Sequence, residues 1–303
     1  MRALVAGWFS FEKMGATAGD LLVRDLVCKW LDSSGCSYDV ALAKPFQGGV
    51  DWEAVDPLDY SDVVFVCGPF GNGWPVTEFL SRFAGRRLLG VNLTMMEALE
   101  TWNPFELLLE RDSSAGSRPD LAFLSEEPRV PLVGIVLSHP QKEYRDRGLH
   151  EAANDALHRL AAAHEMCLVP IDTRLDINAG GLRTPAEVES LIARMDVVLT
   201  TRLHGLVLAL KNCVPVVAID PIAGGAKIRR QADTIGWPMA FTAGEVTDVE
   251  LETALEYCLT PQARVQAEEC RARAQRSLMD VSEQFLSALT PVSKTRYRRQ
   301  ETK

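Results

Sequence analysis

The 303-residue sequence lacks a long apolar run that could span a membrane, and it lacks a cysteine pattern that could bind a metal. No apolar run approaches the ~18 residues of a membrane-spanning helix. The apolar start at residues 3–6 is too short for a signal peptide, so we expect a cytoplasmic protein. The seven cysteines are odd in number, have no CxxC spacing and mostly stand among apolar residues, as in Met166-Cys167-Leu168. We therefore expect buried free thiols rather than a zinc site or a disulfide framework.

Positive charge is also scarce, since 32 Lys and Arg face 41 Asp and Glu for a formal net charge of -9. This balance argues against nucleic acid as a partner, although it leaves room for a local basic pocket that binds an anion. The chain has no P-loop, no dinucleotide-binding fingerprint, no Gly-x-Ser-x-Gly elbow and no metal-ligand spacing. A basic tail at 291–303 is expected to be flexible and solvated, with at most peripheral contact with an anionic membrane.

Short apolar runs alternate with helical patterns along two stretches of the chain. The first stretch has strands expected at 4–6, 38–42, 62–67 and 88–91, and a helix at 20–30 with Leu22, Leu26 and Trp30 on one face. An irregular segment follows at 111–131. The second stretch has strands expected at 132–137, 167–170, 196–199 and 214–219 and helices at 149–163 and 203–211. Another helix begins after Thr184, where Pro185 and Glu187 complete a capping box.

Strands that are apolar on both faces and separated by helices indicate parallel sheets covered on both sides. We therefore predict an α/β protein of two doubly wound Rossmann-like domains, at 1–125 and 126–290. A long helical segment at 262–289 ends the second domain and could pack back on the first. Ligands of such sheets bind beyond the carboxyl ends of the strands, so residues that follow strands are the candidates for chemistry.

One strand-to-helix junction stands out, at residues 196–210. Arg202 and His204 come at the first turn of the expected helix, which Thr200 or Thr201 could cap. Unpaired backbone N–H groups and the helix dipole favour an anion at this position. Arg202 adds a planar charged fork suited to phosphate or carboxylate, and His204 can carry a proton at neutral pH. The alternative is that His204 only packs at the helix start.

Several motifs together resemble the polysaccharide pyruvyl transferase family over about residues 1–240. The most specific is Thr201-Arg202-Leu203-His204-Gly205, followed by a small apolar helix and the run 214–219. Lys227 falls where the family commonly has a lysine, and Ile235-Gly236-Trp237 resembles its next turn. Weaker likenesses are Ala18-Gly19-Asp20, Pro119-Asp120-Leu121-Ala122-Phe123 and the segment 170–176. The sequence departs from the family at Ala16, at Ser138-His139-Pro140, where an arginine is common, and in the glycine-rich loop 68–73.

The resemblance implies a two-domain architecture like that of GT-B glycosyltransferases and transfer of pyruvyl from phosphoenolpyruvate to hydroxyls of a sugar or other acceptor. The product is a ketal, phosphate is released, and no cofactor is needed. His204 would then be the general acid that protonates the donor methylene. The donor would be bound by Arg202, Leu203, His204, Gly205 and Lys227. An enzyme of this kind could form a homo-oligomer.

Five further residues are candidates for binding the acceptor, each with a plain structural alternative. Asp20 could bind a sugar hydroxyl, or its charge could complement a helix dipole. Asp176 could also bind the acceptor, or it could form a surface ion pair with Arg174. His139 follows a strand and is expected to point into the cleft, whereas His150, His158 and His164 are expected at the surface. Gly68 and Asn72 lie in a loop that could wrap a ligand or be a tight turn. The alternatives for the whole chain are a GT-B-like glycosyltransferase using a nucleotide-sugar and a non-catalytic sugar- or anion-binding protein.

Overall fold

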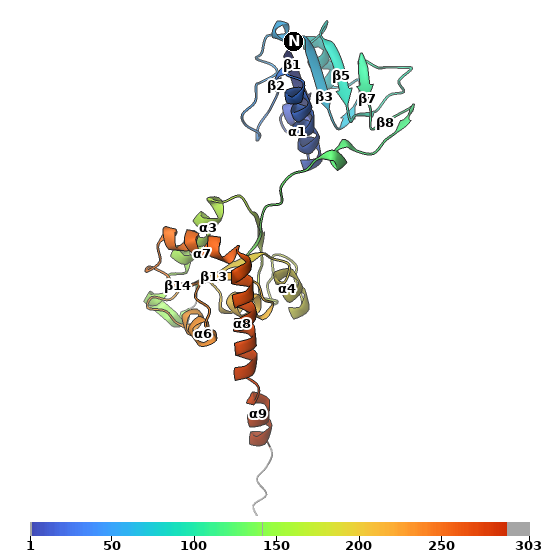
Figure 1. The fold of residues 1–303 in the computed structure, drawn as a ribbon. Helices are drawn as coiled ribbons and strands as arrows, with labels where there is room; N and C mark the ends of the chain where they lie inside the picture. Colours follow the sequence, from blue (N-terminus) through green and yellow to red (C-terminus); the bar gives the residue numbers. More distant parts are fainter. Residues whose placement is uncertain (1, 141, 290–303) are drawn as a thin grey trace, which may run out of the picture. The chain divides into compact units, whose positions relative to one another are not determined.

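The structure, a computed structural model, describes residues 2–140 and 142–289. The chain divides between Pro128 and Arg129 into two compact units, each with its own parallel sheet. The predicted α/β class with two doubly wound domains is therefore confirmed (Figure 1). The basic tail at 291–303 lies outside the described residues.

The larger sheet of the first unit is parallel, with the order β2-β1-β3-β5-β7. Its strands are β2 (Ser37–Val40), β1 (Arg2–Gly7), β3 (Asp62–Val66), β5 (Arg87–Val91) and β7 (Leu107–Leu109). A smaller sheet follows the order β4-β6-β8-β9, formed by β4 (Pro69–Phe70), β6 (Thr94–Met95), β8 (Asp112–Ser113) and β9 (Gly116–Ser117). Period-two alternation along β1 sends Ala3 and Val5 to one face and Leu4 and Ala6 to the other.

Helix α1 (Ala18–Ser33) covers one face of this sheet, and an aromatic core that includes α2 (Val76–Arg82) covers the other. The predicted helix is present, but its buried residues are Val23 and Val27, which lie beside the face of Leu22, Leu26 and Trp30. A helix beside a sheet buries only the stripe that meets the sheet, and the register of that stripe depends on how the helix docks. Trp30 is 43% exposed as a result.

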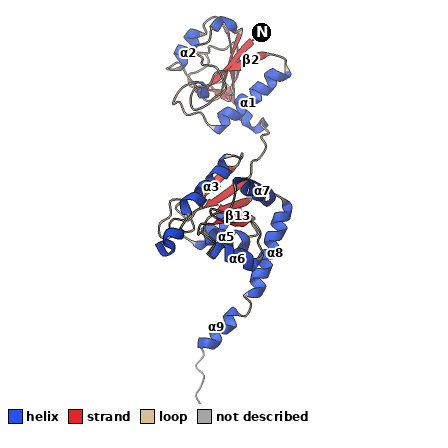
Figure 2. Cartoon of the chain, turned by 90° about the vertical axis from the view of Figure 1, so that its left-hand side faces the viewer, coloured by secondary structure: helices blue, strands red, loops and turns tan. Residues whose placement is uncertain are grey.

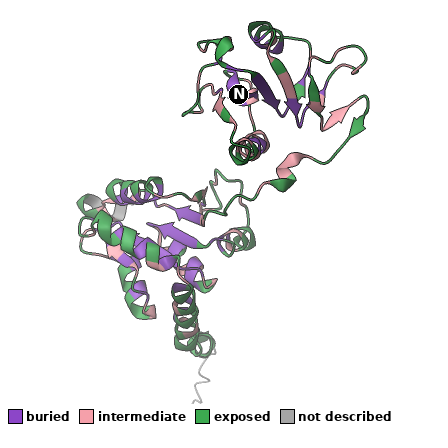
Figure 3. Cartoon of the chain, turned by 45° about the horizontal axis from the view of Figure 1, so that its top comes forward, coloured by how far each residue is buried: buried purple, intermediate pink, exposed green. Residues whose placement is uncertain are grey.

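The sheet of the second unit is also parallel, with the order β11-β10-β12-β13-β14. Its strands are β11 (Cys167–Pro170), β10 (Leu132–Val136), β12 (Val197–Thr200), β13 (Val216–Asp220) and β14 (Ala240–Thr242). Figure 3 shows buried strands at the centre of the unit, where β10, β12 and β13 lie.

The two faces of the second sheet are covered by different helices, as Figure 2 shows. Contacts join α3 (His150–Ala162) to α7 (Asp248–Cys258), and they join α5 (Leu203–Lys211) to both α4 (Pro185–Ile192) and α6 (Lys227–Ile235). Helix α4 begins as predicted, because Thr184 caps it and Glu187 closes the capping box. The long helix expected at 262–289 is instead two helices, α8 (Pro261–Ser277) and α9 (Val281–Leu289). The break at 278–280 contains neither Gly nor Pro, so no residue in the sequence marks it.

All seven cysteines lie in the described ranges and are free, as predicted. Cys167 is exposed rather than buried, because β11 is the edge strand of its sheet. No helix between residues 2 and 289 combines the length and apolar character needed to cross a bilayer. Over the same residues, no three His, Cys, Asp or Glu side chains group as a metal site.

Candidate functional site

The strand order of the second unit creates a crevice between β10 and β12. These strands are neighbours, but the chain leaves β10 toward β11 on one side and leaves β12 toward β13 on the other. Loops that diverge in this way open a crevice at the carboxyl ends of the two strands, which is where doubly wound sheets bind ligands. Ser138 follows β10 and Arg202 follows β12 at this edge.

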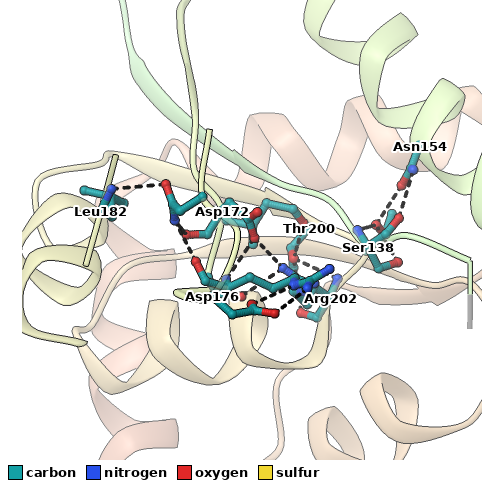
Figure 4. A network of polar contacts seen from close by, with 12 residues as sticks. Ser138, Asn154, Asp172, Asp176, Leu182, Thr200 and Arg202 are labelled. Atoms are coloured by element: carbon teal, nitrogen blue, oxygen red, sulfur yellow. Dashed lines mark hydrogen bonds and ion pairs between the residues drawn. The ribbon is translucent and has the colours of Figure 1, made fainter. Parts of the chain in front are cut away.

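Buried polar side chains tie the two strand ends together (Figure 4). The Thr201 hydroxyl accepts the Ser138 N–H at 2.9 Å and donates to the Asn154 side-chain oxygen at 2.7 Å. The Asn154 amide in turn donates to the Ser138 carbonyl at 3.2 Å. Ser138 and Thr201 are both buried, so these bonds hold the loops in one arrangement. Ser138 therefore forms a fixed part of the crevice wall.

Thr200, the last residue of β12, holds the start of α5 in place. The Thr200 hydroxyl donates to the Val136 carbonyl at 2.7 Å and accepts the Arg202 N–H at 3.0 Å. A threonine cap was predicted, but the N-cap residue is Arg202 and no side chain caps the helix. Gly205 is required here for packing, because a Cβ atom on it would lie 2.1 Å from Thr200 Oγ1. Gly205 thus faces the strand beneath the helix and does not line the pocket described below.

The uncapped helix start leaves backbone donors available. The N–H groups of Gly205 and Leu206 bond the Arg202 carbonyl. Among the described residues, the N–H groups of Leu203 and His204 have no acceptor. Such donors at the positive end of a helix favour an anionic ligand.

Arg202 is anchored on one side only. Its Nη1 donates to Asp172 Oδ1 at 2.7 Å and to Thr173 Oγ1 at 3.2 Å (Figure 4). Its Nε and Nη2 atoms have no acceptor in the part of the chain that the structure describes. The ion pair with Asp172 therefore orients the guanidinium while part of its donor fork stays available. Sequence reasoning missed the role of Asp172, whose only signal is its place two residues after the strand β11.

A pocket of about 220 Å³ gathers most of the predicted donor-binding residues. Arg202, Leu203 and His204 line it from the start of α5, and Lys227 lines it from the start of α6. Tyr144, in the 3-10 helix Lys142–Arg147, lies beneath Lys227, with the ammonium 5.4 Å from the ring centroid. The pocket thus holds two cationic side chains, a histidine and two unpaired N–H groups around one small volume.

Asp220 forms the inner wall of this pocket and was missed from the sequence. Its buried carboxylate accepts the N–H groups of Ala226 at 2.7 Å, Ile228 at 3.0 Å, Arg229 at 3.1 Å and Ile222 at 3.2 Å. These bonds satisfy the N-terminus of α6 from inside the protein. Of the two helices that begin at the pocket, α6 therefore has a buried carboxylate at its start, whereas no side chain caps α5. The signal for this role was an aspartate that ends an apolar strand and precedes Pro221.

His150 is buried, not at the surface as predicted, with 4% of its area exposed. It is the first residue of α3, and the Leu149 N–H just before it bonds the Pro221 carbonyl. This bond places His150 against the loop after β13. Its Nε2 atom is enclosed and has no partner in the described ranges. Burial lowers the pKa of His150, and the nearby Asp220 opposes this shift only in part.

The buried His150 predicts a pH-dependent stability that His150→Phe removes. Because burial lowers its folded-state pKa below the ordinary value of 6.5, the unfolded chain binds a proton that the folded chain excludes. This contribution is complete above about 6.5 and is lost as the pH falls. We expect the free energy of unfolding to drop less for His150→Phe than for the wild type between about pH 7.5 and about pH 5.5. Chemical denaturation measures it, with the exposed His158→Gln as control. Equal drops in all three proteins would contradict the prediction.

The predicted acceptor residues of the second unit lie outside the pocket. His139 is exposed and does not line it. Asp176 forms a two-pronged ion pair with Arg174, at 2.5 and 3.0 Å, which lowers the pKa of Asp176 to about 2. A carboxylate of such low basicity is a poor general base at neutral pH.

Asp20, Gly68 and Asn72 belong to the first unit and have local roles there. Asp20 completes the capping box of α1, accepting the Thr17 N–H at 2.7 Å. Gly68 has a φ of 80° and packs against Trp8, so another side chain would collide with the indole. Asn72 is exposed, and its N–H bonds Glu97.

Residues 105–221 match the family model of polysaccharide pyruvyl transferase. The match confirms the resemblance drawn from the sequence. It covers β10, β12 and the start of α5, and therefore Ser138, Arg202, His204 and Asp220; Lys227 lies beyond it. No curated protein shows significant sequence similarity to the chain.

The chain is similar to several solved structures, among them the following three. The spinosyn forosaminyltransferase SpnP is 14% identical, with 95% of this chain and 99% of that chain covered and a TM-score of 0.35. The calicheamicin glycosyltransferase CalG4 is 12% identical, with 96% and 99% covered and a TM-score of 0.34. HepE of Anabaena, in complex with UDP and glucose, is 14% identical, with 95% and 100% covered and a TM-score of 0.36.

Proposed function

We propose that the protein transfers a pyruvyl group from phosphoenolpyruvate to hydroxyls of a sugar or another hydroxylated acceptor. The observation that carries this proposal is the pocket at the start of α5, inside the segment that matches the pyruvyl transferase family. Phosphoenolpyruvate carries a phosphate and a carboxylate on a three-carbon skeleton. The pocket offers the unpaired side of Arg202, the Lys227 ammonium and two backbone N–H groups to these anions.

The size of the pocket also favours a small donor. Its volume of about 220 Å³ is below the ~300–1,000 Å³ of pockets that hold drug-sized ligands. A phosphorylated three-carbon acid suits this volume better than a nucleotide-sugar does. The alternative function, a glycosyltransferase that uses a nucleotide-sugar, therefore has less support from this site.

The chemistry assigns a role to each residue in turn. His204 protonates the methylene carbon of the donor, which makes C2 electrophilic. An acceptor hydroxyl adds to C2 and its proton returns to His204, the C2–O bond to phosphate breaks, and a second hydroxyl closes the ketal as its proton passes to the phosphate that leaves. Arg202 and the N–H groups of Leu203 and His204 stabilise the negative charge on the phosphate that leaves. Asp172 acts through Arg202 by holding its Nη1 atom. No cofactor enters this scheme.

Saturating phosphoenolpyruvate should raise the melting temperature of the second unit by several degrees, and Arg202→Ala should remove most of this rise. A ligand at a hundred times its Kd stabilises the folded state by about 2.7 kcal/mol. For chains of this size each kcal/mol raises Tm by roughly 2–4 °C. Differential scanning calorimetry with and without the donor measures the effect.

Arg174→Ala is the matched control, because Arg174 also pairs with an aspartate in the loop after β11 but lies outside the pocket. Its response to phosphoenolpyruvate should equal that of the wild type. A shift with UDP-glucose or dTDP-glucose and none with phosphoenolpyruvate would favour the glycosyltransferase alternative. No shift with any donor would favour the non-catalytic alternative.

A further inference from the structure

A second pocket, of about 590 Å³, lies within the first unit at the carboxyl ends of β1 and β2. Residues 10–12 after β1 and 42–44 after β2 line it, together with Trp52, Trp74 and Glu78. None of the acceptor residues expected from the sequence is among its lining residues. The carboxyl end of a parallel sheet is the edge where doubly wound folds bind ligands.

Trp52 gives the pocket a fixed hydrogen-bond donor that no described residue satisfies. The residue is only 8% exposed, and its ring is packed against Phe11 and Phe79 at centroid distances of 5.6 and 5.4 Å. Its indole N–H has no acceptor in the described ranges, yet it is not enclosed like the unpaired nitrogens of His150 and His164. Buried tryptophans usually find a partner for this group, and on Trp52, which lines the pocket, the N–H is open to water or to a ligand oxygen.

Trp74 supplies a flat apolar surface at the same pocket. It directly follows the glycine-rich loop 68–73 and is 69% exposed. An indole face of this kind packs against a rigid ring whose C–H bonds form a flat patch. The face of a pyranose presents such a patch, together with hydroxyls that reach the Trp52 N–H.

The charged side chains that line the pocket determine whether a positive or a negative ligand is favoured there. Four carboxylates line it, from Glu12, Asp51, Glu53 and Glu78, against one ammonium, from Lys44. None of these five groups forms an ion pair with another described residue. The pocket is therefore unsuited to an anion such as phosphoenolpyruvate and suited to a ligand that carries a positive charge.

We propose that this pocket binds an amino sugar with a free amine as the acceptor. The sugar ring stacks on Trp74, a hydroxyl accepts the Trp52 N–H, and the ammonium lies among the four carboxylates. The designation of this sugar as an acceptor rests on the proposed function. The binding itself does not, because it involves residues of the first unit alone.

Three sugars with the same ring and different charge test the proposal, namely D-glucosamine, D-glucose and D-glucuronate. Saturation-transfer NMR titrations of the full chain at about pH 6 keep the amine of glucosamine charged. We expect glucosamine to bind about tenfold more tightly than glucose, which is the effect of one charge-assisted hydrogen bond, and glucuronate not to bind. Equal affinity for the three sugars, tighter binding of glucuronate, or no binding of any sugar would overturn the proposal.

Variants separate the three contacts. Glu78→Gln should bring glucosamine affinity toward that of glucose, Trp52→Phe should weaken both sugars by a similar factor, and Trp74→Ala should abolish both signals. Trp30→Ala, an exposed tryptophan of α1 outside the pocket, is the control and should bind like the wild type. Unchanged binding in Trp74→Ala would overturn the proposal.

The melting shift with phosphoenolpyruvate keeps the two proposals distinguishable. It should be the same in Trp74→Ala as in the wild type, because Trp74 does not line the donor pocket. Glucosamine binding without a phosphoenolpyruvate response would leave this pocket established and the transferase function refuted.

Discussion

Replacement of His204 by asparagine is expected to lower turnover by about 10²–10⁴-fold with little change in donor affinity. Asparagine occupies a similar volume but cannot deliver a proton to the donor methylene. His204 lines the pocket, is exposed, and its imidazole forms no hydrogen bond or ion pair with another described residue, so its loss should not disturb the fold. Phosphate release from phosphoenolpyruvate with the best of a panel of mono- and oligosaccharides measures turnover.

His158→Asn is the control for this experiment, because His158 is an exposed histidine on α3 that does not line the pocket. It should keep wild-type turnover and melting temperature. Near-normal turnover of His204→Asn would remove His204 from the mechanism. A rise in KM with an unchanged kcat would assign it to substrate binding instead.

Replacement of Asp220 by alanine should destabilise the second unit by about 3–5 kcal/mol. The variant loses charge-assisted hydrogen bonds from four backbone N–H groups and leaves those donors buried without an acceptor. The first turn of α6, which carries Lys227, should open as well. Calorimetry measures the stability, and hydrogen exchange should show faster exchange at residues 226–229 than in the wild type.

Asp233→Ala provides the comparison, because Asp233 is an aspartate on the same helix that forms an exposed i,i+4 pair with Arg229. Exposed pairs of this kind contribute at most about 1 kcal/mol, so this variant should stay close to the wild type. Unchanged melting and exchange in Asp220→Ala would show that the α6 start does not depend on its carboxylate.

The two predictions test different parts of one pocket. His204 projects from a helix start that no side chain caps, whereas Lys227 projects from a helix start that Asp220 caps from within. The first arrangement leaves backbone donors for an anion, and the second fixes a cation beside them. A donor with two anionic groups uses both.

Periodicity and residue spacing along the chain predicted those helices, strands and caps whose contacts are local. The apolar runs predicted strands close to β3 and β11, and the spacing after Arg202 predicted α5 at its observed bounds. The capping box at Thr184 and Glu187 also formed as expected, because its bonds join residues three apart in the chain. Residues 278–280 include no Gly or Pro, so the sequence did not predict the break between α8 and α9.

The sequence by itself determined the α/β class, the division into two α/β units and the junction at which Arg202 and His204 follow a buried strand. These follow from periodicity and from one contiguous motif. Only the tertiary structure decided that Asp172 anchors Arg202, that Asp220 caps α6, and that His150 is buried. Each of these depends on contacts between segments far apart in the chain, such as Asp172 and Arg202, which strand order and helix docking bring together. Asp20 and Asp176 are different, because each bonds a partner within three residues along the chain, and these contacts depend on local sequence.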